Sequence, residues 1–256
     1  MPNNQETGVD IPQSAVRSLT NIFFLTDTSG SMSDNGKIDA VNNAMHEAIP
    51  IVRDFAAKEA SHKIQCSILE FNTGVKWITK QPVDAEDLQW IDLSASGATY
   101  LGEAYKHLAL KLSRKEGGVM AQHLNNAPII ILLTDGYPTD DSSAGLSLLK
   151  KNKWFAVAVR IAIEITGGDV DRQQLIDFTG TKELVIPIAS DELQKYLKNI
   201  VVKTMTHSSN AEDVINAVTA GGGSNTTTPT PKPIPAPAPS TTPGSGGSMD
   251  LDDFDF

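Results

Sequence analysis

The 256-residue sequence has a single cysteine, no long apolar run and no excess of positive charge. Cys66 has no partner for a disulfide within the chain, which fits a reducing compartment, and its mixed apolar and polar neighbours predict a small buried residue. No run reaches the ~18 apolar residues of a membrane-spanning helix. Residues 1–17 lack the basic and apolar regions of a signal peptide. We therefore expect a soluble cytoplasmic protein.

Negative charge prevails, with a formal net charge of −10 and a pI of about 4.9. This balance argues against nucleic acid as a partner. Part of the negative charge comes from the last eight residues, which contain four aspartates. Residues 1–248 therefore have a net charge of −6 (−10 plus 4). The apolar fraction of 40% and the charged fraction of 20% are ordinary for a globular protein.

Apolar runs alternate with helical patterns between residues 18 and 205. The runs predict strands at 18–26, 63–71, 75–79, 128–134, 155–163 and 184–188. Apolar residues at three- and four-residue spacing predict helices at 38–56, 101–112, 143–152, 171–178 and 191–205. Pro50 should kink the first helix or begin a second segment. The alternation predicts an α/β fold, a doubly wound, mostly parallel six-stranded sheet with helices on both faces. The turn at 72–74 should make 75–79 an antiparallel edge strand.

The remaining segments differ in composition from this domain of residues 18–205. We expect a flexible arm at 1–17, a short helix at 206–220, and a Gly/Thr/Pro-rich linker at 221–248 that cannot form a core and leaves the C-terminal tail disordered. In the tail, residues 249–256, aspartates alternate with Leu251, Phe254 and Phe256. Two interpretations stay open for it: a solubilising end, or a short motif that binds a basic apolar pocket of a partner.

Oxygen-bearing side chains follow two of the predicted strands. Asp27, Ser29 and Ser31 alternate after the first strand, so in an extended loop they point the same way. Asp135 follows the strand at 128–134. Ligands of such sheets bind at the carboxyl ends of the strands, so both aspartates should lie on one rim. A carboxylate with two hydroxyls suits a hard cation.

Other interpretations of this loop fit less well. Capping Ser and Asp residues at a strand-to-helix turn would give a similar pattern. An EF-hand needs Gly where Met32 stands and Glu where Ile38 stands. A phosphate-binding loop would need one residue fewer before Gly36, and Ser or Thr in place of Ile38. A phosphatase of the haloacid-dehalogenase type would need a second Asp at Ser29 as its general acid, and it remains the main enzyme alternative.

Asp27-Thr28-Ser29-Gly30-Ser31, then Gly97-Ala98-Thr99, then Thr134-Asp135-Gly136 together resemble the metal-ion-dependent adhesion site of von Willebrand factor A domains. The resemblance extends over residues 18–205 and implies a metal site made of Asp27, Ser29, Ser31, Thr99 and Asp135. It implies that the hydroxyls bind the ion directly, while the carboxylates act mainly through waters and hydrogen bonds. The expected ion is Mg²⁺, with Mn²⁺ or Ca²⁺ as alternatives. An open position would then take an Asp or Glu of a protein partner, a binding role without catalysis.

Three segments, 23–32, 101–104 and 132–140, are similar to bacterial cytoplasmic tellurium-resistance proteins of the TerY type. This similarity implies an adaptor in a stress-response or defence signalling complex, with a serine/threonine kinase and a protein phosphatase as candidate partners. Two alternatives stay open: a metal-dependent phosphatase-like enzyme, and a substrate-adaptor subunit for an AAA+ ATPase.

Overall fold

The computed structural model describes residues 18–59, 62–115, 117–120, 125–206 and 216. The arm at 1–17, the linker at 221–248 and the tail at 249–256 lie outside these residues, as does the helix expected at 206–220 apart from Thr206 and Asn216. In the described part of the chain, no helix is both long and apolar enough to cross a membrane.

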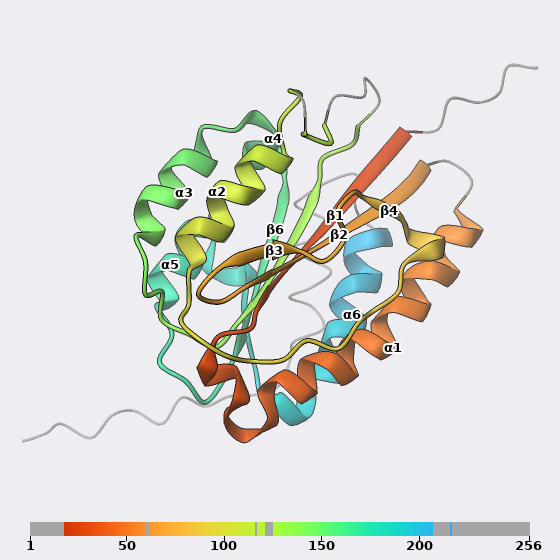
Figure 1. The fold of residues 1–256 in the computed structure, drawn as a ribbon. Coiled ribbons are helices and arrows are strands. Elements are labelled where there is room, and N and C mark those ends of the chain that lie inside the picture. The colour runs from red at the N-terminus through yellow and green to blue at the C-terminus, as the bar shows by residue number, and fades with distance from the viewer. Residues whose placement is uncertain (1–17, 60–61, 116, 121–124, 207–215, 217–256) are drawn as a thin grey trace, which may run out of the picture. The chain divides into compact units, whose positions relative to one another are not determined.

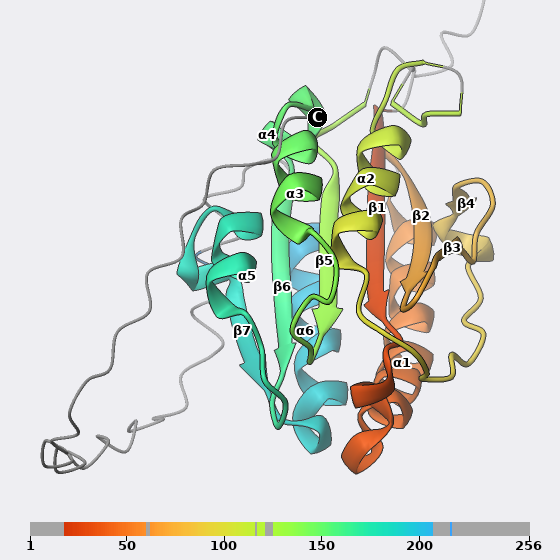
Figure 2. The ribbon, with the colours of Figure 1, turned by 60° about the vertical axis from the view of Figure 1, so that its left-hand side comes forward.

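A seven-stranded sheet forms the centre of the domain, in the order β3-β2-β1-β5-β6-β7, with β4 paired to β2 (Figure 2). Its strands are β1 (Ser18–Asp27), β2 (His62–Phe71), β3 (Val75–Trp77), β4 (Val83–Asp84), β5 (Ile129–Thr134), β6 (Val159–Ile165) and β7 (Val185–Ile188). All neighbours are parallel except β3 and β4, which run antiparallel to β2. The predicted α/β fold is confirmed. The sheet has one strand more than predicted, because the two residues of β4 are too few to show an alternating pattern.

Helices cover both faces of the sheet (Figure 1). On one face lie α1 (Lys37–Lys58) and α6 (Leu193–Thr206), and on the other lie α2 (Leu101–Lys111), α3 (Ser142–Lys150), α4 (Lys153–Val157) and α5 (Arg172–Thr179). Short 3₁₀ turns at Gly30–Gly36, Ala85–Asp87, Lys182–Leu184 and Ser190–Glu192 complete the elements. Pro50 does not divide α1 into two helices, and buried Met45, Ile49 and Val52 hold the helix to the core on either side of it.

The middle of β1 and nearly all of β5 are apolar because both faces of these strands are covered. In β1, Ile22 and Phe24 belong to the core beneath α1 and α6, whereas Phe23 and Leu25 belong to the core beneath α2, α3, α4 and α5. The same alternation runs along β5. These buried strands end abruptly in polar residues, which places the polar residues at one edge of the sheet.

The segment before β6 differs from the prediction of a strand over 155–163. Residues Lys153–Val157 form the short helix α4, and β6 begins only at Val159. The Asn152 side chain caps this helix by accepting hydrogen bonds from the backbone N–H groups of Trp154 (2.8 Å) and Phe155 (3.3 Å). Phe155 then packs against Phe178 at a ring distance of 5.6 Å. An aromatic residue suits a strand as well as a buried helix, so the apolar pattern misplaced this boundary.

Candidate functional site

The ends of β1 and β5 bring two aspartates to the same edge of the sheet. The strands are parallel neighbours, with Thr26 opposite Leu133. Asp27 is the last residue of β1, and Asp135 follows the last residue of β5. Both side chains are buried. The structure therefore places both predicted carboxylates on one rim.

Backbone contacts join the loops that carry the five predicted residues. Gly30 N–H donates to the Gly97 carbonyl (2.9 Å), which ties the loop of Ser29 and Ser31 to the segment before Thr99. Thr99 N–H donates to the Thr139 hydroxyl (3.0 Å), and Thr139 N–H donates to the Thr99 carbonyl (2.9 Å). Because Thr139 belongs to the loop after β5, all three loops are fixed relative to one another.

The two carboxylates are held by the protein itself. Asp27 Oδ1 accepts a hydrogen bond from Ser29 N–H (2.8 Å), and Asp27 Oδ2 accepts one from the Thr134 hydroxyl (2.6 Å). Burial raises the pKa of Asp27 to about 6, although its hydrogen bonds from Ser29 and Thr134 act in the opposite direction. Asp135 Oδ1 accepts from the Ser31 hydroxyl (2.9 Å). The carboxylates are thus oriented before any ion binds.

The hydroxyl groups are spaced as ligands of a small cation would be. Ser29 Oγ and Ser31 Oγ lie 3.2 Å apart. Neighbouring ligands of an octahedral ion at ~2.0–2.1 Å would be roughly 2.9 Å apart, so a small movement would suffice. A Cβ at Gly136 would come within 3.3 Å of both Asp27 Oδ2 and Thr99 Oγ1, so glycine keeps this position open and Thr99 faces Asp27 across it. The residues present fit a hard divalent cation.

Metal sites of the more usual composition are absent from the part of the chain that the structure describes: no three His, Cys, Asp or Glu side chains there could hold an ion together. The candidate site differs from these because hydroxyl groups make up most of it. The Asp140 carboxylate is engaged elsewhere, since it accepts hydrogen bonds from Gly102 N–H (2.9 Å) and Glu103 N–H (2.8 Å) at the start of α2. Tyr137, which follows Gly136 in the same loop, is 60% exposed.

Sequence reasoning missed two residues of this site. Thr134 holds Asp27, as described above. Lys37 Nζ lies 2.5 Å from Asp135 Oδ2, and its side chain is buried. One signal for Lys37 was present: it lies four residues before Val41 and eight before Met45, on the apolar face of α1. A charged residue on that face needs a buried partner.

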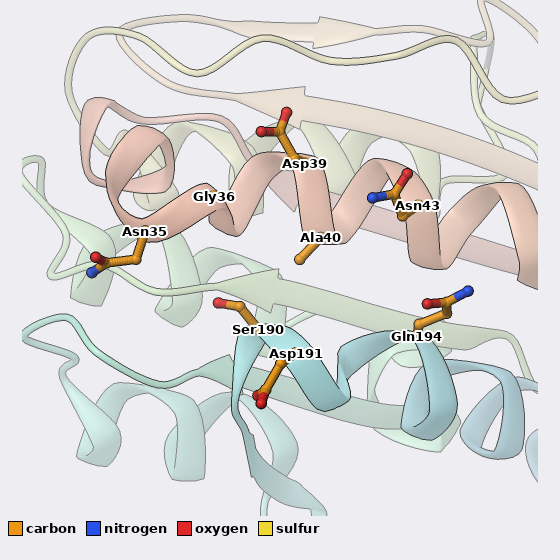
Figure 3. A pocket seen from close by; sticks show the side chains of 8 residues that line it. All are labelled: Asn35, Gly36, Asp39, Ala40, Asn43, Ser190, Asp191 and Gln194. Carbon is orange, nitrogen blue, oxygen red and sulfur yellow. The ribbon is translucent and has the colours of Figure 1, made fainter.

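A separate polar pocket of about 500 Å³ lies between the start of α1 and the start of α6 (Figure 3). Its polar lining residues are Asn35, Asp39, Asn43, Ser190, Asp191 and Gln194. None of the five predicted site residues lines it. The pocket and the candidate site are therefore distinct features.

A sequence model of the von Willebrand factor type A domain matches residues 21–200, most of the chain. The chain belongs to the von Willebrand factor A family. This confirms the family predicted from the sequence motifs. No curated protein matches the chain.

Several solved structures share the fold of this A domain at low sequence identity. Proximal thread matrix protein 1 from the mussel byssus is 23% identical, with a TM-score of 0.54 over 74% of this chain and 48% of that one. A structure of the same byssus protein with a zinc-occupied MIDAS motif is 22% identical, with a TM-score of 0.53 over 72% and 45%. The pilus adhesin SpaC from Lactobacillus rhamnosus GG is 17% identical, with a TM-score of 0.56 over 80% and 31%. This A domain thus spans less than half of each of these proteins.

Proposed function

We propose that this A domain is a divalent-cation-dependent protein-interaction module. The ion would be held by Asp27, Ser29, Ser31, Thr99 and Asp135, and an Asp or Glu of a protein partner would complete its coordination. The observation that carries the proposal is the arrangement of loops at the edge of the sheet. Hydroxyls 3.2 Å apart lie beside two buried carboxylates that protein hydrogen bonds already orient.

The donor set favours Mg²⁺, with Mn²⁺ or Ca²⁺ as alternatives, because hard cations prefer oxygen ligands. Neutral hydroxyls would bind the ion directly, while Asp27 and Asp135 orient them and any bound water. The bound ion would supply an exposed positive charge to which a partner's carboxylate is attracted. The zinc-occupied site of the byssus protein supports a metal-binding role for the shared motif.

Binding without catalysis agrees with the surroundings of Ser29. Ser29 stands where a phosphatase of the haloacid-dehalogenase type would place its general acid, and its hydroxyl lies 3.2 Å from that of Ser31. We therefore propose that the protein is not an enzyme, and a metal-dependent phosphatase-like activity is the alternative that an assay must test.

The wider role that we propose is that of an adaptor in a bacterial cytoplasmic stress-response or defence complex. Its support is the similarity of three sequence segments to tellurium-resistance proteins of the TerY type. A serine/threonine kinase and a protein phosphatase are the candidate partners, and an AAA+ ATPase is the alternative. The tail at 249–256 would add a second contact with a basic apolar pocket of the partner.

Calorimetry with Mg²⁺ and Mn²⁺ tests the site directly. Wild type should bind one ion per chain and Asp27→Ala should bind none. Asp141→Ala is the matched control, because Asp141 is exposed and only caps α3 through Ala144 N–H (2.9 Å). Equal ion binding by wild type and Asp27→Ala would refute the site. Metal-dependent hydrolysis of p-nitrophenyl phosphate that is lost in Asp27→Asn would instead favour the enzyme.

A further inference from the structure

Lys37 places a buried positive charge beside the candidate metal site. Its side chain is 1% exposed, and Nζ lies 2.5 Å from Asp135 Oδ2. The same ammonium donates to the Gly167 carbonyl (3.4 Å) and the Ser31 carbonyl (3.5 Å). All three contacts are with oxygen acceptors, and none of them is a site hydroxyl. The ammonium therefore does not occupy the hydroxyls of Ser29 and Ser31, and it contacts Asp135 Oδ2 while the Ser31 hydroxyl donates to Oδ1.

The position of Lys37 is unfavourable for a residue with a merely structural role. It is the first residue of α1, where the helix dipole favours negative charge. Burying a flexible lysine also costs side-chain entropy and desolvation. Its contact with Asp135 offsets these costs, so the Lys37–Asp135 pair accounts for a buried lysine at this position. The metal-free site thereby has a built-in cation for one of its two buried carboxylates.

The loop after β6 closes over this pair. A Cβ at Gly168 would come 2.4 Å from the Asp135 carbonyl and 3.4 Å from Lys37 Nζ. Gly167 has a φ of +102°, a conformation that glycine adopts readily. Two successive glycines thus allow the backbone to cover the pair and keep water away from it. Charge interactions are stronger in such an enclosed site than in water.

We infer that Lys37 couples binding of the ion to binding of an anionic partner group, so that each strengthens the other. With both carboxylates ionised, they and the Lys37 ammonium sum to −1 (−2 plus 1). A divalent ion alone would leave the enclosed site at +1, and a partner's carboxylate would bring it to zero. Without Lys37 the ion alone would neutralise the site, and an added carboxylate would leave it at −1. Lys37 would therefore weaken binding of the ion by itself and strengthen the coupling between the ion and an acidic partner group.

This inference rests on the proposed metal site, and Lys37→Met tests it in the full chain. Methionine is unbranched and one atom shorter than lysine, so it keeps most of the side chain and removes its charge. We expect Lys37→Met to bind Mn²⁺ about tenfold or more tightly than wild type in calorimetry, because a repelling charge is lost. Acetate, the probe for a partner carboxylate, should strengthen Mn²⁺ binding in wild type and have less effect in Lys37→Met. Nitrate at equal ionic strength controls for screening.

Lys111→Met is the matched control. Lys111 is also buried, at 7% exposed, but it donates to the Lys80 carbonyl (3.1 Å) and lies over the Trp77 ring, at the other end of α2 from the site. Its loss should leave the affinity for Mn²⁺ unchanged. Thermal unfolding in EDTA and in Mn²⁺ gives a second measurement: Mn²⁺ should raise the Tm of Lys37→Met more than that of wild type. If Lys37→Met does not fold, Lys37→Gln replaces it, because the amide can still donate to Asp135.

The outcomes separate this inference from the proposed metal site. If wild type binds Mn²⁺ and Asp27→Ala does not, but neutral Lys37 variants bind equally or more weakly, the inference is wrong and the metal site stands. Acetate effects of the same size in wild type and Lys37→Met would also contradict it. If neither wild type nor any Lys37 variant binds an ion, both proposals are refuted.

Discussion

Replacing Thr134 by valine should loosen the candidate site without changing its shape. Thr134 is fully buried at the end of β5, and valine has nearly the same volume. The threonine hydroxyl donates to Asp27 Oδ2 (2.6 Å) and accepts from Gly136 N–H (3.2 Å). Valine removes both interactions at once. Asp27 then keeps its hydrogen bond from Ser29 N–H but loses a donor to the other oxygen.

The expected cost follows from these two contacts. A hydrogen bond to a charged group contributes roughly 1.5–3 kcal/mol, and a buried donor left without a partner costs about 1–3 kcal/mol. Because these terms overlap, we expect Thr134→Val to lower the free energy of unfolding by about 2–4 kcal/mol. For a domain of this size that corresponds to a fall in Tm of roughly 6–12 °C.

The measurement is urea unfolding of metal-free protein at pH 8, above the pKa of about 6 that burial gives Asp27. Thr26→Val is the matched control, since Thr26 is equally buried at the end of the neighbouring strand β1. The Thr26 hydroxyl has no hydrogen-bond partner among the residues that the structure describes, so its loss should be neutral or stabilising. If Thr134→Val were no more destabilising than Thr26→Val, the hydrogen bond to Asp27 would not hold the site.

Three further predictions concern the surroundings of the site. Asp140→Ala should lower stability by about 1–2 kcal/mol in thermal unfolding, because Gly102 N–H and Glu103 N–H lose their cap; an unchanged Tm would contradict this. Gly145→Ala should lower the free energy of unfolding in urea by about 1–3 kcal/mol, because its Cβ would come 2.3 Å from the Gly102 carbonyl where α2 and α3 meet. Alanine favours helices, so a stabilised variant would show that the two helices can separate. Cys66 should react with a disulfide reagent at pH 8 only after unfolding, because the thiol is buried and burial raises its pKa to about 12. Fast reaction of the native protein would contradict that burial.

Much of the site could be predicted from the order of residues along the chain. One apolar run ends in Asp27 and another ends just before Asp135, which predicted that both carboxylates lie at strand ends. Parallel strands bring such ends to one edge of the sheet. The alternation of Asp27, Ser29 and Ser31 predicted a common direction in an extended loop, but Ser31 lies in the 3₁₀ turn at Gly30–Gly36, where its hydroxyl still comes within 3.2 Å of that of Ser29. Local pattern was enough for the two carboxylates because strand direction decides which edge of the sheet they reach.

Only the tertiary structure decided how these side chains are held. Thr134 reaches Asp27 because β1 and β5 are neighbours in a particular register, and a sequence does not state register. The apolar face of α1 shows that Lys37 needs a buried partner, but choosing Asp135 required knowing where α1 begins relative to β5. The metal-binding motif of the family can be recognised in the sequence. The positive charge beside one of its carboxylates comes from Lys37, which lies 98 residues before Asp135 and reaches it only because the folded chain packs the two together.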